Sequence, residues 1–188
     1  MKINDDIMDI SLTQVSNSAK QLEIDTCLKL NPKILIPEQR IRNFCRENKC
    51  SNYDAHHMCP PRIGSLEEVT SKLGEFHQGI LLRYSKPVDA AEDYKGVVRT
   101  KVAFHNKILE LEEHFAKQGI NNIWGMIGGS CALCEFCKAR SEDPCPYPDK
   151  ARTSLESIGI DVQNLLEKYG LDNKFYSSQI TWTGCILF

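Results

Sequence analysis

The chain has 188 residues, of which 41% are hydrophobic and 26% charged, and its formal net charge is −2 at pH 7. These values are typical of one globular domain whose core needs no disulfide staples. The mixed charges argue against nucleic acid or an anionic membrane surface as partners. Because the N-terminus lacks a secretory h-region and the apolar runs are too short to span a bilayer, we expect a cytoplasmic protein.

The first half of the chain is predicted to contain two helices and one strand. Residues 1–36 form a polar leader with a short helix at 12–24. The segment 36–64 is dense in Cys, Asn and Pro and is predicted to be irregular. A Ser cap with Glu in the following turn indicates a helix at 65–76, and the apolar run 79–85 indicates a strand.

The second half is predicted to alternate helices and strands around a cysteine-rich loop. Apolar residues at helical spacing predict a helix at 97–117, and a second helix is predicted at 154–169. Strands are predicted at 121–130 and 175–188. This order predicts an α+β fold, in which helices pack on one face of a small sheet and cysteine-rich loops bind metal. We expect a single metal-binding domain over 1–188, with its core at 38–188.

Four of the nine cysteines lie close together near the middle of the second half. Cys131, Cys134 and Cys137 form a C-x2-C-x2-C run, and Cys145 follows with a proline directly behind it. A tandem run places three thiolates on one loop, from which three iron corners of a cubane can be reached. Cytoplasmic thiols stay reduced, so metal binding is favoured over disulfides. These four cysteines are therefore predicted to bind a [4Fe-4S] cluster.

Structural zinc is the alternative for the same four cysteines. Zinc sites commonly pair two separated C-x2-C knuckles around a tetrahedral ion. The middle thiol of a strict tandem is hard to aim at such an ion. The spacing therefore favours iron–sulfur over zinc, and either metal over free buried thiols.

Three glycines, Gly125, Gly128 and Gly129, come just before the tandem run. Glycine allows a close approach of the backbone, so these residues are predicted to bring N–H groups near cluster sulfides. The same segment lacks the Lys of a phosphate loop. Nucleotide binding is therefore weakly supported.

A second group of cysteines lies earlier in the chain. Cys45, Cys50 and Cys59 have the spacing C-x4-C-x8-C, and Pro60 follows the last of them. The surrounding segment is irregular enough in sequence to wrap a cluster. We therefore predict a second [4Fe-4S] site here, with a looser spacing than in the first.

The fourth ligand of this second site is left open among three residues. Cys27, His56 and His57 are the candidates, and a pair of adjacent histidines is more often exposed than ligating. Two complete cubanes would use eight cysteines and leave only Cys185. That cysteine lies in the apolar C-terminal strand, where a free cysteine usually packs as a small core residue.

Arginines flank both groups of cysteines. Arg42, Arg46 and Arg62 lie beside the earlier group, and Arg140 and Arg152 beside the later one. Cationic donors near a cluster stabilise its reduced form and raise its potential. Ordinary solvated arginines are the alternative for each of them.

The chain resembles the family catalogued as domain of unknown function 2284, the predicted metal-binding proteins of bacteria and archaea. The resemblance rests on RNFCRENKCSNYDAHHMCPP and GGSCALCEFCKARSEDPCPYPDKARTSLESIGIDV and extends from about residue 38 to the C-terminus. Pro146 after Cys145 and a less aromatic 53–58 depart from the family pattern. The resemblance implies a metal or iron–sulfur protein without an established reaction, and it carries over the seven cysteines Cys45, Cys50, Cys59, Cys131, Cys134, Cys137 and Cys145.

These patterns favour an iron–sulfur protein that carries two [4Fe-4S] clusters and passes electrons to or from a partner enzyme. No flavin or nicotinamide fingerprint is present, so the chemistry would fall to a redox partner protein. One alternative is a zinc-stabilised binding module, in which the metal supplies folding energy. Another is an enzyme with an open iron corner. No nucleophile–base pair or paired carboxylates indicate a hydrolase.

Overall fold

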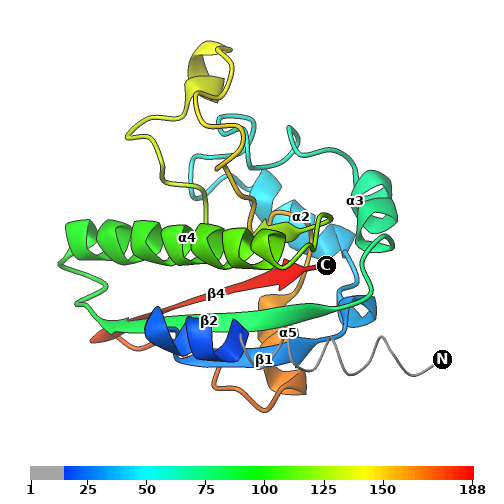
Figure 1. Cartoon of the computed structure of the whole chain (residues 1–188). Helices are drawn as coiled ribbons and strands as arrows, with labels where there is room; N and C mark the ends of the chain where they lie inside the picture. The colour runs from blue at the N-terminus through cyan, green and yellow to red at the C-terminus, as the bar shows by residue number, and fades with distance from the viewer. Residues whose placement is uncertain (1–14) are drawn as a thin grey trace.

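A four-stranded antiparallel sheet forms the centre of the protein, whose computed structural model describes residues 15–188 (Figure 1). The strand order is β1-β2-β4-β3. The strands are β1 (Thr26–Leu30), β2 (Gly79–Pro87), β3 (Trp124–Met126) and β4 (Gln179–Leu187). The two nine-residue strands, β2 and β4, pair along their whole length from Gly79↔Leu187 to Pro87↔Gln179. The predicted α+β class is confirmed.

Helices cover both faces of this sheet, whereas the sequence pattern placed them on one. Residues 15–21 are helical. The other helices are α2 (Gln39–Arg46), α3 (Leu66–Leu73), α4 (Tyr94–Lys117) and α5 (Val162–Lys168), with short 3-10 helices η1 (Pro32–Ile34) and η2 (Lys138–Ser141). The long helix α4 lies across one face, and α3 and α5 contribute to the core on the other (Figure 1). The central strands are therefore buried on both sides.

The core on the α4 face is aromatic and aliphatic. Phe104 and Phe115 of α4 are fully buried against Ile80 and Ile186 of the central strands. Phe104 fits because Gly184 has no Cβ, since one built there would lie 3.0 Å from the Phe104 ring. This face thus depends on close packing between a helix and a central strand.

The opposite core joins the sheet to α3, α5 and residues 155–160. Leu81 and Cys185 face each other across β2 and β4, and both side chains are completely buried. The expectation that Cys185 is a core residue is confirmed. Burial raises the pKa of its thiol, as expected for a sulfur that remains protonated.

Several elements with a local signal match the prediction. The helix predicted at 65–76 is α3, which begins with a reciprocal capping box between Ser65 and Glu68. The helix predicted at 97–117 is α4, and the strand predicted at 79–85 is β2. The C-terminal strand is β4, although it begins four residues later than predicted.

Other boundaries differ from the prediction. The helix α2 lies inside the segment predicted to be irregular, and β1 lies inside the predicted leader. The strand predicted at 121–130 is only the three-residue β3. Residues 1–14 of the leader fall outside the described residues.

The helix predicted at 154–169 forms only in its second half, as α5. The Ser154 hydroxyl accepts a hydrogen bond from the Ser157 backbone N–H, which gives this stretch an alternative to helical bonds. Gly159 has a φ of 93° and packs against the Glu38 backbone. Asp161 then caps α5 by accepting from the Asn164 N–H. Across residues 15–188, no helix combines the length and apolar character needed to cross a bilayer.

Candidate metal centre

Seven cysteines gather in a part of the protein that we call the cysteine lobe, residues 45–62 and 130–149. Figure 1 shows the later segment rising above α4 to its tip at η2, away from the sheet. The strands and the helices other than η2 and the end of α2 form the remainder, which we call the sheet body. The lobe contains turns and bends, with η2 as its longest regular element apart from the end of α2.

Charged and polar side chains tie the two segments of the lobe together. Arg62 forms a two-pronged ion pair with Glu142, with nitrogen–oxygen distances of 2.6 and 3.2 Å. Arg140 donates to the Ser51 carbonyl oxygen at 2.7 Å. These contacts join residues more than 75 positions apart in the chain. The two groups of cysteines are therefore neighbours in space.

Two adjacent histidines make further links between the segments. The buried His56 donates through Nε2 to the Cys131 carbonyl oxygen at 2.9 Å, and His57 donates through Nε2 to the Asp143 carbonyl oxygen at 2.9 Å. The His57 backbone N–H also donates to the Cys137 Sγ at 3.5 Å. The pair thus connects the segment of the earlier cysteines to the loop of the later ones.

The four later cysteines line one small pocket. Cys131, Cys134 and Cys137 come from the tandem run, and Cys145 reaches the same pocket from beyond η2. The remaining walls come from both segments of the lobe: His56, His57, Leu133, Pro146 and Tyr147. The structure therefore brings together the four residues that the sequence grouped.

Backbone N–H groups point at sulfur atoms in this pocket. Burial raises the pKa of Cys131, while hydrogen bonds from the Leu133 and Arg152 backbones act to lower it. Burial also raises the pKa of Cys134, and the neighbouring Cys137 and Cys145 act in the same direction. Neighbouring thiols thus disfavour the ionisation of Cys131 and Cys134, so an added positive centre would stabilise these two as thiolates.

The three earlier cysteines also influence one another. Cys45 lies at the end of α2, Cys50 is exposed, and Cys59 is buried. The pKa of Cys59 is raised to about 12, chiefly by burial and in smaller part by the charges of Cys50, Cys45 and Cys137, while a hydrogen bond with Ser157 acts to lower it. The thiol of Cys59 is thus influenced by a cysteine of the later group as well as by its own group.

Neither group has the geometry of a bound metal ion. Among residues 15–188, no three Cys, His, Asp or Glu side chains are arranged to hold a metal ion. The lobe brings the thiols together by backbone position, and their donor chemistry suits iron–sulfur or zinc.

The candidate fourth ligands of the earlier group are placed elsewhere or already engaged. Cys27 lies on β1 opposite Leu82 and packs into the core on the α4 face. The proposal of Cys27 as a ligand is therefore corrected: it belongs to the sheet body. The Nδ1 of His56 accepts from the Met58 N–H while its Nε2 is also bonded, and the His57 Nε2 is bonded as well.

One flanking arginine is buried next to the earlier cysteines. Arg42 is 7% exposed, and its Nη1 donates to the Gly64 carbonyl oxygen at 3.1 Å. Its Nε and Nη2 are buried and have no hydrogen-bond partner among the described residues. Its positive charge acts to lower the pKa of the Cys45 thiol, which burial raises. A buried guanidinium with two free donors is a place for an anion.

A lysine that the sequence analysis did not single out lies between the two groups. Lys101 of α4 is half-buried, and its Nζ lies 3.5 Å from the Ser130 hydroxyl. Burial lowers its pKa, and the charges of Cys131 and Cys59 raise it. The Lys101 ammonium therefore interacts electrostatically with one cysteine of each group, Cys59 and Cys131. Nothing in the helical pattern of α4 distinguishes this lysine from a solvated one.

A buried carboxylate anchors both ends of the cysteine loop to α4. Glu112 accepts from the Gly125 N–H at 2.8 Å and pairs with the Arg152 guanidinium at 2.6 Å. The Gly125 backbone thus bonds to Glu112, and Gly128 packs against Trp182, so the glycines here serve packing in the sheet body. Arg152 likewise turns to Glu112 and holds the loop in place.

The comparisons with known proteins agree with a metal centre. A family model described as predicted metal-binding protein (DUF2284) matches residues 29–188. Because the match spans most of the chain, the protein belongs to this family. No curated protein and no solved structure gives a significant match.

Proposed function

We propose that this DUF2284 protein is an iron–sulfur protein that transfers electrons to or from a partner enzyme. Cys131, Cys134, Cys137 and Cys145 would hold one [4Fe-4S] cluster, since all four line one pocket. That shared pocket is the observation that carries the proposal. When bound, a cubane supplies one-electron redox chemistry.

The earlier cysteines would hold a second cluster. The buried Arg42 supports this assignment, because its two unpartnered N–H donors lie next to Cys45 and an anionic cluster would satisfy them. Without an anion, each of these buried donors would stay unsatisfied, which costs about 1–3 kcal/mol for each group. The chemistry of the site thus fits an anion that carries sulfur.

The position of Lys101 supports the proposal that the clusters accept electrons. Its ammonium acts on Cys59 and Cys131 from a half-buried position. A cation near a cluster stabilises its reduced state, which is the more negative one. In this arrangement Lys101 lowers the cost of adding an electron to either site.

Exposed aromatic residues mark a surface where the partner would dock. Phe136, inside the tandem run, is 73% exposed, and Phe44, next to Cys45, is 61% exposed. Tyr147, two residues beyond Cys145, is 47% exposed. Aromatic side chains are enriched in protein–protein interfaces. A redox partner that covers these residues would come close to both groups of cysteines.

An enzyme with an open iron corner is a second candidate for the earlier group. Cys27 lies in the sheet body, and His56 already uses both ring nitrogens, so two of the three candidate fourth ligands are engaged elsewhere and His57 is left. A cluster held by three cysteines leaves one iron open to a substrate.

Metal analysis of anaerobically purified protein tests the proposal. We expect brown protein with about eight iron atoms and about as many acid-labile sulfides per chain, as two cubanes require. Cys134→Ser should lose about half of the iron, and Cys185→Ala, in the core, should lose none. Colourless protein with stoichiometric zinc would instead identify a zinc-stabilised binding module. Iron that never exceeds about four, with cysteines of both groups needed for it, would refute the second cluster.

A further inference from the structure

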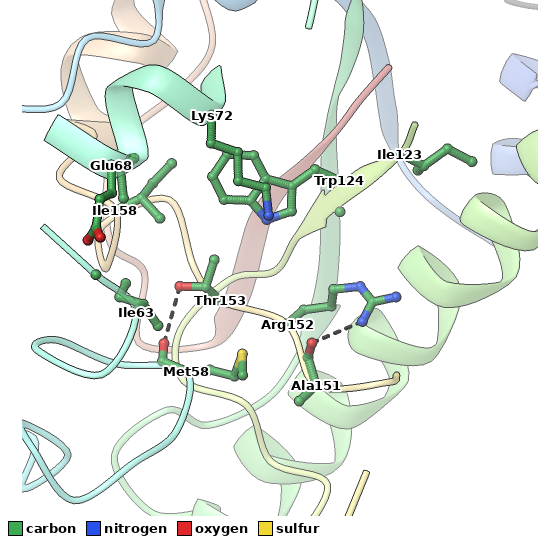
Figure 2. Close-up of a pocket in the computed structure, with 13 residues that line it drawn as sticks. Met58, Ile63, Glu68, Lys72, Ile123, Trp124, Ala151, Arg152, Thr153 and Ile158 are labelled. Carbon is green, nitrogen blue, oxygen red and sulfur yellow. Dashed lines mark hydrogen bonds between the residues drawn. The ribbon is translucent and has the colours of Figure 1, made fainter. Parts of the chain in front are cut away.

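A larger cavity lies at the β3 edge of the sheet, where α3, β3 and residues 151–158 meet (Figure 2). Its volume is about 610 Å³, which is within the range of small-molecule sites. Its walls are mostly apolar and come from four segments of the chain: Met58, Ile63, Val69, Ile123, Trp124 and Ile158. Such walls suit contact with the apolar body of a ligand.

Most polar groups around this cavity already have partners. The Arg152 guanidinium turns toward α4, where it pairs with Glu112 (Figure 2). The Thr153 hydroxyl donates to the Met58 carbonyl oxygen at 3.2 Å. The Glu68 carboxylate accepts from the Ser65 N–H as part of the capping box. The Arg152 charge is balanced by Glu112, whereas the Glu68 carboxylate keeps its negative charge at the α3 end of the cavity.

Lys72 also lines this cavity, and its ammonium has no ion-pair partner among the described residues. Its Nζ lies 4.1 Å from the centre of the Trp124 ring, and the ion pairs of the described residues do not include it. Glu68, four positions earlier on α3, would be its usual partner on a helix, but the capping box holds that carboxylate. The exposed Lys72 side chain thus places its ammonium over the aromatic face of Trp124, and the charges of Glu75 and Arg152 also act on it.

We propose that this cavity binds a small organic carboxylate with an apolar body. The carboxylate would pair with the Lys72 Nζ, and the body would lie against the apolar walls beside Trp124. The site borders the cysteine lobe, because Met58 lines it and the next residue is Cys59. The inference does not depend on the proposed electron transfer, since it rests on the cavity alone.

Equilibrium dialysis of the metal-loaded full-length protein with radiolabelled benzoate tests this assignment. We expect saturable binding of one benzoate per chain. Benzamide, the neutral isostere, and inorganic phosphate, which lacks the apolar body, should each compete about tenfold more weakly or worse. Absence of saturable binding, or competition by benzamide or phosphate equal to that of benzoate, would overturn the proposal. This comparison uses the unmodified protein, so it does not depend on the folding of a variant.

Substitutions at Lys72 locate the site. Lys72→Met should weaken benzoate binding about tenfold, while Lys72→Arg, which keeps the charge, should retain most of it. The matched control is Lys117→Met, because Lys117 is an exposed lysine of α4 that pairs with Glu113 and does not line the cavity. Unchanged binding by Lys72→Met, or a loss as large in Lys117→Met, would place the carboxylate elsewhere.

Discussion

The sheet body and the cysteine lobe are organised by different forces. In the sheet body, residues such as Leu81, Phe104 and Ile186 are completely buried between the strands and the helices on both faces. In the cysteine lobe, aromatic residues such as Phe136 are exposed, and ion pairs and hydrogen bonds to backbone connect the segments. Apolar burial of the first kind is the main source of folding free energy, whereas exposed ion pairs contribute little.

The two regions are expected to differ in how much their structure depends on bound metal. The contacts that hold the lobe, such as Arg62 with Glu142, are largely surface contacts. Each such pair contributes about 0–1 kcal/mol. We therefore expect the proposed metal to fix most of the geometry of the lobe, and the sheet body to fold without it.

The largest expected effect comes from truncating the core of the sheet body. Phe104→Ala removes a fully buried ring that stacks on Tyr84 with centroids 5.9 Å apart. The free energy of unfolding should fall by about 3–5 kcal/mol. Chemical denaturation measures it, and Phe175→Ala, at a 93% exposed position, is the control that should change it by less than about 0.5 kcal/mol. A similar loss in both variants would show that the body does not depend on this packing.

A smaller loss of stability is expected from substitution of Glu112, which links the sheet body to the cysteine loop. Glu112→Ala removes the carboxylate partner of the Arg152 guanidinium and frees the Gly125 N–H, at both ends of the cysteine loop. Because the pair is mostly buried, we expect a loss of about 3 kcal/mol and faster release of iron. Glu113→Ala, one position along and exposed, should be nearly neutral. If Glu112→Ala kept both its stability and its iron, the anchoring role would be wrong.

The smallest effect concerns pH at the junction between the two regions. His105 is 1% exposed, donates through Nε2 to the Lys150 carbonyl oxygen, and has an unpartnered Nδ1. Burial lowers its pKa below the usual value of 6.5, so the unfolded chain takes up a proton first as the pH falls. The stabilising contribution of neutral His105 is therefore complete above pH 6.5 and is lost progressively below it.

The corresponding measurement is the free energy of unfolding between pH 7 and pH 5. The wild-type slope due to this single proton cannot exceed about 1.4 kcal/mol per pH unit. His105→Gln should give a flatter curve, with His77→Gln on the surface as the matched control. A curve that stays equally steep in His105→Gln would assign the pH dependence to another group.

Local signals in the sequence predicted most of the sheet body. The capping box at Ser65 and the apolar periodicity of α4 predict these helices because the causes lie within a few residues. The spacing of the tandem cysteines likewise placed Cys131, Cys134 and Cys137 on one loop. Where the cause is local, the sequence is a good guide.

Long-range contacts account for the features that the sequence did not predict. The edge strand β1 depends on its pairing with β2, from Thr26↔Arg83 onward. The burial of Arg42 and the pairing of Arg62 with Glu142 depend on two segments that meet only in the folded chain. Cys27 was a candidate ligand by composition, and only its position on β1 removes it from the site.

Hydrogen exchange with and without metal tests the central claim most directly. Metal would be removed from the anaerobic, reduced protein with a chelator, and amide exchange would be followed by mass spectrometry along residues 15–188. We expect exchange to accelerate in residues 45–62 and 130–149 while β2, β4 and the middle of α4 keep their protection. Loss of protection in β2 and β4 together with the lobe, or an unchanged lobe after complete removal of metal, would contradict the account.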